Sequence, residues 1–251
     1  MTGPRLSAIW RHPLKAIGRE ALESVTLSTG AWMPWDRVWA VEHANSKPLD
    51  GGWAHKMNFL RGVTDPSLMA ITAAYDEASG TLTLDHPAAG QIVFNPDAED
   101  DRDHFLEWAG RVWSSDLPLP TGIYKARDAH LSDVPEAWIS INSTASLAEV
   151  SARAGQDLSP DRWRGNLWID GMTPWAEFDL VGRKIVIGDV ELKVHQPITR
   201  CKATMANPTT GVRDADTLGV LQSFGHQDFG VYAEVITGGE IKVGQAVEFR
   251  P

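Results

Sequence analysis

The sequence predicts a mainly β fold of the α+β class, rich in barrel-like sheet and carrying one or two helices. Three observations favour this fold. β-Branched and aromatic residues recur in short runs, glycine and proline separate these runs, and only one long segment has clear helical spacing. Short strands with this punctuation favour a barrel-rich fold over a doubly wound parallel sheet.

In the N-terminal half, strands are predicted at 7–10, 25–27, 37–42, 68–75, 81–84 and 91–94. The first ends at His12-Pro13, because proline cannot donate a hydrogen bond to a neighbouring strand. The polar turn 76–80 joins two of the strands into a hairpin. Residues 97–112 carry apolar side chains at helical spacing behind an acidic start, which predicts a helix.

The proline- and glycine-containing stretch 117–122 marks the predicted boundary between two domains, 1–116 and 117–251. Beyond it, strands are predicted at 139–142, 167–169, 184–187, 190–194 and 231–235. The last segments, 238–244 and 247–249, predict a closing hairpin.

A short helix is predicted to begin within 143–150, where Ser143 and Ser146 are alternative N-caps. A tight turn at Gly188-Asp189 is expected to join the strands on either side of it. With these elements, the second domain is also mainly β.

The composition is that of a globular chain, with 43% hydrophobic and 22% charged residues. A net charge of −10 disfavours nucleic-acid binding but permits a small basic site for one anion. No apolar run has transmembrane length and the N-terminus lacks a signal-peptide core, so we expect no membrane partner and a cytoplasmic location. The 11 tryptophans are expected to pack cores or to wall a flat ligand.

Cys201 is the one cysteine of the chain. Alone it forms no internal disulfide and no structural zinc or iron–sulfur site. Three roles stay open: a buried inert thiol, a nucleophile, or one thiolate ligand to a metal whose other ligands come from a cofactor.

Six segments distributed along the chain, one of which contains Cys201, form a pattern. They are Pro13-Leu14-Lys15-Ala16; Asp36-Arg37-Val38-Trp39; 143–147; Trp163-Arg164-Gly165-Asn166-Leu167; Arg200-Cys201 with Thr204 and Asn207-Pro208-Thr209-Thr210-Gly211; and 229–232 with 239–244. In this order they resemble the motifs of MOSC domains and of the β-barrel domain that precedes them. The chain is thereby identified as a member of the molybdenum cofactor sulfurase C-terminal superfamily, similar to the mitochondrial amidoxime-reducing component and its bacterial relatives.

The resemblance implies an MOSC-type β-barrel combined with an N-terminal β-barrel-like domain, and a molybdenum cofactor (Mo-molybdopterin). It implies that Cys201 is the catalytic residue and the molybdenum ligand. It also implies a set of cofactor-binding residues: Lys15, Arg37, Thr144, Ser146, Arg164, Asn166, Thr199 and Arg200.

The chain departs from the family pattern at four places. Ala16 stands where a serine is frequent, and Gly18 where a basic residue is common, with Arg19 one position later. Gly165 replaces a proline and Asn207 replaces an aspartate. The phosphate contacts of the first loop and the substrate preference are therefore expected to differ from those of the best-known members.

The resulting hypothesis is an oxidoreductase that removes oxygen from N-hydroxylated, or N- or S-oxygenated, small molecules. A separate protein with a flavin, haem or iron–sulfur group is expected to supply the electrons. His195 and Asp214 are candidates for proton delivery, although each also fits a structural role. The alternatives are a non-catalytic molybdopterin or sulfur carrier, and a metal-free hydrolase that pairs Cys201 with His195, His226 or His55.

Overall fold

The structure confirms the mainly β fold. The computed structural model describes residues 3–251. Its strands are β1 (Arg5–Arg11), β2 (Glu20–Leu22), β3 (Ser24–Leu27), β4 (Trp39–His43), β5 (Thr72–Asp76), β6 (Thr81–His86), β7 (Gly90–Phe94), β8 (Pro120–Lys125), β9 (Trp138–Ser143), β10 (Leu167–Asp170), β11 (Lys184–Ile187), β12 (Val190–Thr199), β13 (Asp228–Thr237), β14 (Gly239–Lys242) and β15 (Val247–Arg250).

The α-helices within these residues are α1 (Glu99–Val112), α2 (Thr144–Ala154) and α3 (Thr217–Gln222). Short 3-10 helices are η1 (Lys56–Asn58), η2 (Pro66–Ala70), η3 (Pro160–Trp163), η4 (Phe178–Leu180) and η5 (Lys202–Met205). None of the helices in residues 3–251 combines the length and apolar character needed to cross a membrane.

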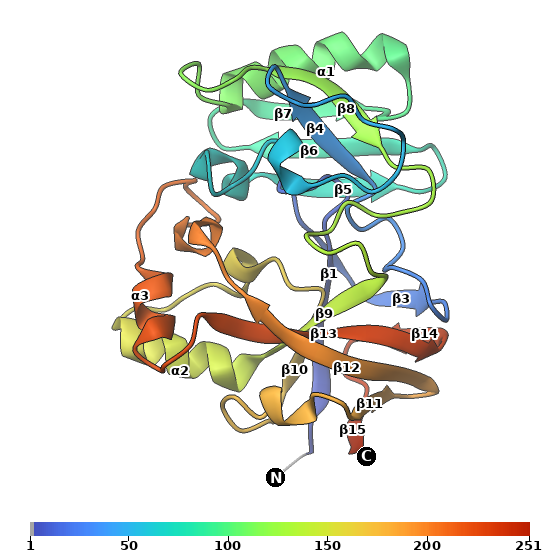
Figure 1. Ribbon diagram of the computed structural model, residues 1–251, viewed down its shortest axis with the longest axis vertical. Coiled ribbons are helices and arrows are strands. Elements are labelled where there is room, and N and C mark those ends of the chain that lie inside the picture. The colour runs from blue at the N-terminus through green and yellow to red at the C-terminus, as the bar shows by residue number, and fades with distance from the viewer. Residues whose placement is uncertain (1–2) are drawn as a thin grey trace.

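Strand pairing divides the molecule into two lobes, one above the other in Figure 1. The lower lobe is built on one sheet in the order β15-β11-β12-β13-β9-β10-β1-β2, with the pair β14-β3 beside it. The upper lobe holds the sheet β5-β6-β7, the pair β4-β8 and helix α1. Among the described residues no ladder closes this sheet, but Arg5 of β1 forms a bridge with Ala246 next to β15, and the N–H of Val247 donates to the Pro4 carbonyl (2.9 Å), so the sheet is a nearly closed barrel.

The sheets do not follow the predicted division at residues 116 and 117. β1 and β3 come from the first predicted segment. β1 nevertheless lies between β10 and β2 in the lower sheet, and β3 pairs with β14 of the second segment. β8 comes from the second segment and pairs with β4 of the upper lobe. Chain segments from both ends therefore meet in the lower lobe, and the domain division by sequence stays a prediction.

Most predicted elements occur in the structure. The hairpin around 76–80 is β5-β6, and the helix predicted at 97–112 is α1, whose first turn carries Glu99, Asp100 and Asp101. Ser143 is the N-cap of α2 and accepts from the backbone N–H of Ser146, so the first of the two alternatives is confirmed.

The predicted closing hairpin is wrong. β14 pairs with β3, where Ile241 faces Val25, and β15 pairs with β11, where Phe249 faces Ile185. Both strands bury apolar side chains against partners far away in sequence, and the alternating pattern does not reveal those partners. Residues 68–70 also differ from the predicted strand 68–75, because they belong to the 3-10 helix η2 that Pro66 begins. The sequence did not predict β2, β8 or α3, and the first residues of β8 lie in the predicted boundary stretch.

Each lobe has its own apolar core. In the lower lobe Ile141, Leu192 and Val231 are fully buried within the sheet core. In the upper lobe Trp39 and Phe94 are buried beneath α1 and the three-stranded sheet. Both cores are large enough to hold their sheets rigid, so that the junction between the lobes is a fixed surface.

Arg19 ties the two lobes together. Its guanidinium donates to the carbonyls of Met69 (3.1 Å), Ile71 (3.2 Å) and Pro208 (3.0 Å) and to Oδ2 of Asp161 (3.0 Å). A basic side chain does not fit one residue earlier, because a Cβ on Gly18 would lie 2.7 Å from the Cβ of Ala73 and Gly18 has a φ of +71°. The shift of the basic residue to position 19 therefore has a steric cause.

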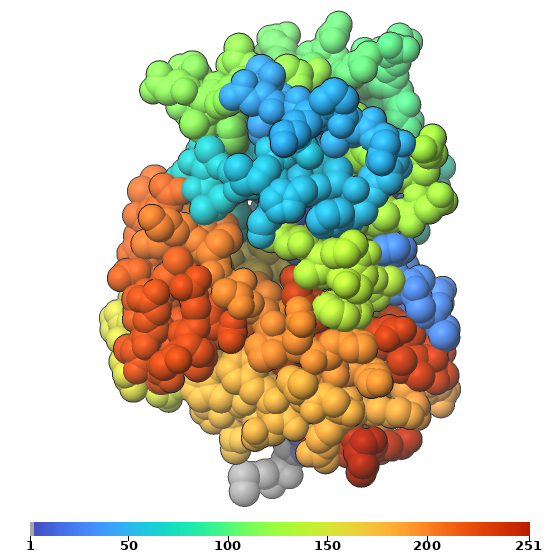
Figure 2. Space-filling model, in the orientation of Figure 1, coloured from blue at the N-terminus to red at the C-terminus, as the bar shows by residue number. Residues whose placement is uncertain are grey.

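Figure 2 shows the surface hollowed where the cyan segment of the upper lobe meets the orange segment of the lower lobe. The same junction brings the loop around Gly62 close to Ala203, since a Cβ on Gly62 would lie 3.6 Å from the Cβ of Ala203. The residues that follow Cys201 therefore face the upper lobe.

Arg19→Met should lower the free energy of unfolding by about 2–3 kcal/mol, because three carbonyls and one carboxylate lose a charged donor. Urea unfolding followed by circular dichroism measures the loss. Arg102→Met is the matched control: Arg102 pairs with Glu99 on the exposed face of α1, and its loss should cost at most about 0.5 kcal/mol. Equal losses in the two variants would contradict this role of Arg19.

Candidate functional site

Four basic side chains converge at the lobe junction, and we call them the basic cluster: Lys15, Arg37, Arg164 and Arg200. Nη2 of Arg37 donates to the backbone carbonyl of Arg164 (3.0 Å). The charge of Arg37 lowers the pKa of each of the other three, so all four lie within electrostatic range. They come from four separate chain segments, which only the tertiary fold brings together.

The backbone at the cluster is strained. Ala16, Arg37 and Arg164 have φ values of 63°, 56° and 49°, in the left-handed region that side chains rarely occupy. Such conformations cost of order 1–3 kcal/mol each and persist where the surroundings determine them, commonly at functional sites. Strain at three places around one cluster supports a functional role for it.

Two of the four cations have carboxylate partners. Nζ of Lys15 donates to Oδ1 of Asp133 (2.6 Å) and to the carbonyl of Leu131 (2.7 Å). Nη1 of Arg37 binds Asp36, which also accepts from the backbone N–H of His12 (2.7 Å). Burial alone would lower the pKa of Arg37, but the Asp36 carboxylate outweighs it and raises the pKa.

Arg164 and Arg200 are half-buried and have no carboxylate partner among the described residues. Nη1 of Arg164 donates to the carbonyl of Gly18 (2.9 Å). Nη1 and Nε of Arg200 donate to the carbonyls of Trp163 (2.7 Å) and Phe229 (2.8 Å). Burial, followed by the charge of Arg37, lowers the pKa of Arg164 to about 9. Burial lowers the pKa of Arg200 to about 10.

The cluster therefore carries excess positive charge. Four cations face two carboxylates, those of Asp36 and Asp133, which leaves two positive charges uncompensated. A buried charge without a partner is costly, and an anionic ligand would relieve that cost. The arrangement suits a phosphate or another compact anion.

Two buried donors beside Arg200 also lack acceptors: Nδ2 of Asn142 and Nε1 of Trp163. The Oδ1 of Asn142 accepts from Nη2 of Arg200 (3.0 Å), so the amide is held next to the guanidinium. The region is thus rich in donors and short of acceptors, as expected for a site that receives an acceptor-rich ligand. Sequence reasoning missed Asn142 and Trp163 as site residues, because neither belongs to a polar motif.

Cys201 follows Arg200 directly and is exposed, so the inert buried thiol is wrong. Its backbone is braced, since Thr204 donates to the Cys201 carbonyl through its backbone N–H (3.2 Å) and its hydroxyl (3.1 Å). Gln227 exchanges two hydrogen bonds with the backbone of Arg200, of 2.9 and 2.6 Å. An exposed thiol on a fixed backbone thus lies one residue from the half-buried guanidinium of Arg200, which has no carboxylate partner.

The four other predicted cofactor-binding residues use their polar groups within the protein. The amide of Asn166 bonds to Ser140 and to the carbonyl of Trp10, and the side chain is buried. Ser146 is fully buried, donates to Oε2 of Glu177 (2.7 Å) and accepts from the backbone N–H of Trp175 (2.8 Å). These bonds give Asn166 and Ser146 structural roles.

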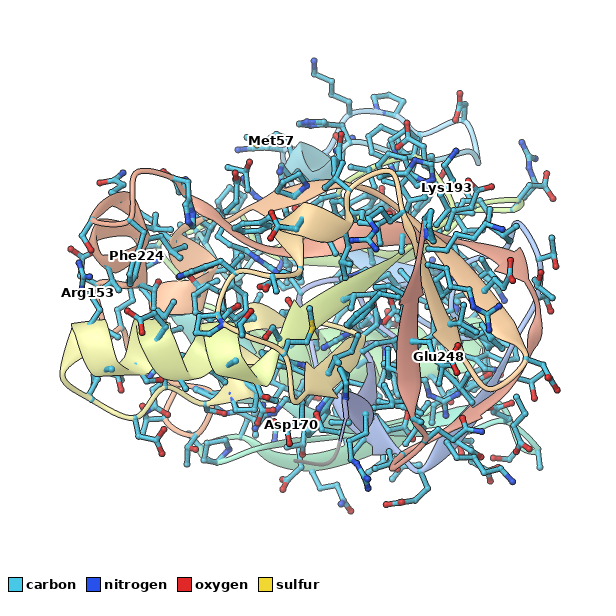
Figure 3. All side chains as sticks on the ribbon, turned by 90° about the horizontal axis from the view of Figure 1, so that it is seen from below. Met57, Arg153, Asp170, Lys193, Phe224 and Glu248 are labelled. Atoms are coloured by element: carbon cyan, nitrogen blue, oxygen red, sulfur yellow. The ribbon has the colours of Figure 1, made fainter. Side chains whose placement is uncertain are left out.

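Thr144 binds Oδ1 of Asp170 (2.8 Å), where β9 and β10 end. Figure 3 shows Asp170 on the opposite side of the view from Met57, the chain neighbour of Lys56. Lys56 pairs with Asp133 (3.3 Å), the carboxylate that also binds Lys15. Thr199 lies near Cys201 and donates to Asp228 (2.6 Å).

The proposed proton-delivery residues are also engaged. His195 pairs with Glu234 (3.0 Å) and stacks on Trp138, and Asp214 binds Arg162 (2.6 Å). In residues 3–251 no histidine is hydrogen bonded to the Cys201 thiol, so the Cys–His hydrolase gains no support. Tyr232 was missed by the sequence: burial raises the pKa of its phenol, and Asp133, Arg200 and Arg37 lie within electrostatic range.

The departures from the family pattern have structural explanations. A side chain at Gly165 would collide with Asn142, because its Cβ would lie 1.7 Å from Nδ2. The Oδ1 of Asn207 accepts from the N–H groups of Thr209 (2.8 Å) and Thr210 (3.3 Å), as an aspartate would. Within residues 3–251 no three His, Cys, Asp or Glu side chains gather as a metal site, so a metal here needs ligands from another source.

Comparison with known proteins matches the chain to two domain families: the MOSC N-terminal beta barrel domain over residues 3–116 and the MOSC domain over residues 126–248. Mitochondrial amidoxime reducing component 2 of Bos taurus is 30% identical over 96% of this chain and 82% of its own length. Mitochondrial amidoxime-reducing component 1 of Homo sapiens is 33% identical over 43% of this chain.

Molybdenum cofactor sulfurase of Drosophila mojavensis is 24% identical over 91% of this chain. The chain spans 32% of that protein and 35% of the human one, so about a third of each. Among solved structures, the YUAD protein from Bacillus subtilis has a TM-score of 0.47 at 12% identity, with 98% of this chain and 94% of that chain covered.

Gly165→Ala should destabilise the protein by about 2–3 kcal/mol, because the new methyl overlaps the Asn142 amide. Adding Asn142→Ala should recover at least about 1 kcal/mol in a double-mutant cycle. Gly110→Ala is the control, since nothing lies within 4 Å of the added methyl on α1. Additive effects of the two changes would show that the strain lies elsewhere.

Glu177→Gln should stabilise the protein by about 1 kcal/mol at pH 8 and have little effect at pH 4. Burial raises the pKa of Glu177, so the folded protein holds this proton more tightly than the unfolded chain and loses stability as pH rises through the raised pKa. Glutamine, neutral throughout, avoids that loss. Denaturant melts across this pH range test the prediction, with exposed Glu107→Gln as control. A stabilisation by Glu177→Gln that is larger at pH 4 than at pH 8 would contradict the prediction.

Proposed function

This chain belongs to the MOSC-domain family, with an MOSC N-terminal beta barrel domain ahead of the MOSC domain, and from that premise we propose that it is a molybdenum-cofactor-dependent reductase. Its substrates would be N-hydroxylated, or N- or S-oxygenated, small molecules. The reaction cleaves the N–O or S–O bond, takes up two protons and two electrons, and releases the oxygen as water. A separate protein with a flavin, haem or iron–sulfur group supplies the electrons.

One observation carries the proposal: the exposed thiol of Cys201 lies next to half-buried cations that lack carboxylate partners. This donor set fits the proposed group, whose pterin bears a phosphate and many acceptor atoms. When bound, the group supplies a redox-active metal with two sulfur ligands of its own, so that one protein thiolate suffices. Thiolate is a soft ligand suited to such a metal.

The chain's own residues have distinct tasks in this proposal. Arg164 and Arg200 hold the anionic part of the cofactor through charge-assisted hydrogen bonds. Lys15 and Arg37, each tied to a carboxylate, set the shape of the site and add to its positive field. Asn142 and Trp163 offer donors to acceptor atoms. The Tyr232 phenol, whose raised pKa keeps it protonated at neutral pH, holds a proton beside Arg200.

The test is the molybdenum and pterin content of protein purified from a host that makes the cofactor. The native chain should retain both near stoichiometry. Cys201→Ser should lose molybdenum, and Arg164→Gln should lose pterin at least about tenfold more readily, since one charge-assisted contact is removed. Arg153→Gln, at the exposed end of α2 where Figure 3 shows Arg153 beside Phe224, is the matched control.

A native chain with neither molybdenum nor pterin would overturn the proposal. With both retained, reduction of an amidoxime and of an S-oxide by chemically reduced viologen identifies the substrate class. Activity should be absent in Cys201→Ser and present in Arg153→Gln.

The second candidate is a non-catalytic carrier of molybdopterin or sulfur on Cys201. It is favoured by the alignment with a protein named molybdenum cofactor sulfurase and by the exposure of the thiol. A carrier would release its cargo during gel filtration or to an acceptor protein and would not turn over substrate. A reductase would keep its metal through the same step.

A further inference from the structure

We propose that Asn142 is a positioning residue of the anion site, whose side-chain amide orients the guanidinium of Arg200 without neutralising its charge. The proposal rests on the function proposed above, in which Arg200 holds the anionic part of the cofactor. Asn142 lies on β9 and is fully buried. Within residues 3–251 it is the one residue whose side chain accepts a hydrogen bond from Arg200, with 3.0 Å between Nη2 and Oδ1.

Three acceptors hold the guanidinium of Arg200. Its Nε donates to the carbonyl of Phe229 (2.8 Å), its Nη1 to that of Trp163 (2.7 Å), and its Nη2 to Asn142. A guanidinium has five N–H groups, so two remain for a ligand. Of the three acceptors only Asn142 is a side chain. It is therefore the one whose contribution a substitution can remove without altering the backbone.

Two glycines make room for the Asn142 amide. A Cβ on Gly165 would lie 1.7 Å from Nδ2, and a Cβ on Gly230 would lie 2.3 Å from Oδ1. Gly230 also has a φ of +73°, a conformation that favours glycine. Each glycine lies within two residues of a carbonyl that binds Arg200. The two segments that hold the guanidinium therefore also open the space for the amide.

Packing alone does not explain a polar side chain at this position. Nδ2 of Asn142 is buried and has no hydrogen-bond partner among the described residues. A buried donor without an acceptor costs free energy, and an apolar side chain of the same size would avoid that cost. Within the chain, the hydrogen bond from Arg200 to Oδ1 is the one side-chain interaction that offsets it.

The neutrality of the amide is the second part of the role. Lys15 and Arg37 each bind a carboxylate, which compensates their charge. Beside Arg200 the corresponding place is taken by Asn142, which accepts a hydrogen bond but carries no charge. A carboxylate there would form an ion pair with the guanidinium and compete with an anionic ligand. The amide fixes the donor and leaves its charge to the ligand.

Isothermal titration of the full-length, cofactor-free protein with inorganic pyrophosphate, a compact anion, tests the proposal. Asn142→Asp keeps an acceptor oxygen but pairs Arg200 with a negative charge, so the affinity for pyrophosphate should fall at least about tenfold. Asn95→Asp is the matched control. It makes the same change of charge in the upper lobe, where Asn95 follows β7 and accepts from the N–H of Asp97. It should change the affinity less than about twofold.

Asn142→Leu has a similar size and removes the acceptor, so pyrophosphate affinity should fall about three- to fivefold. In an Arg200→Gln background the same change should have no further effect, because Asn142 acts through Arg200. The urea midpoint of Asn142→Leu should stay unchanged, since removal of the unpartnered Nδ2 donor offsets the lost hydrogen bond. A purely structural role predicts the reverse: a lower urea midpoint with unchanged pyrophosphate affinity.

Three results would overturn the proposal: no pyrophosphate binding by the native chain, native affinity in Asn142→Asp, or additive effects of Asn142→Leu and Arg200→Gln. None of these measurements depends on molybdenum. A native chain that purifies without molybdenum and pterin but shows the expected pyrophosphate pattern would overturn the reductase and leave Asn142 its role at an anion site. Retained molybdenum with native pyrophosphate affinity in Asn142→Asp would overturn only the role of Asn142.

Discussion

Partly buried positive charge is the constraint on which the rest of the site depends. The half-buried guanidiniums of Arg164 and Arg200 are held by neutral carbonyls, and Arg37 adds a third guanidinium beside them. Such an arrangement is unfavourable by itself, because desolvation disfavours the charged forms. The surrounding fold maintains it through the Asp36 and Asp133 carboxylates and through backbone turns that the packing holds in strained conformations.

The topology explains how charges from distant segments meet. β1 runs through the lower sheet, and the chain then enters the junction, where Lys15 and Arg19 lie, before the upper lobe begins. Arg164 precedes β10, the neighbour of β1, and Arg200 follows β12. The two lobes thus supply opposite walls of one site, and Arg19 locks their relative position. A site between two rigid bodies keeps its geometry without a ligand.

The basic cluster and Cys201 differ in their exposure to solvent. Lys15 is buried and the three arginines are half-buried, where an anion is bound more strongly than in open solvent, whereas the thiol is exposed, where a substrate or a donor protein can approach it.

The sequence by itself determined the mainly β class, the helix α1, the start of α2 with Ser143 as one of two alternative N-caps, and the family, because these depend on local periodicity, capping and short motifs. It also identified the four cations of the cluster, through their motif positions. Only the tertiary structure decided which strands pair, so the closing hairpin was wrong and the domain division is not followed by the sheets. It likewise showed that Asn166 and Ser146 are buried and hydrogen bonded within the protein, and it added Asn142, Trp163 and Tyr232 to the candidate site. The physical reason is that strand pairing, hydrogen-bond partners and burial depend on residues far apart in the chain, whereas a sequence motif contains only neighbouring residues.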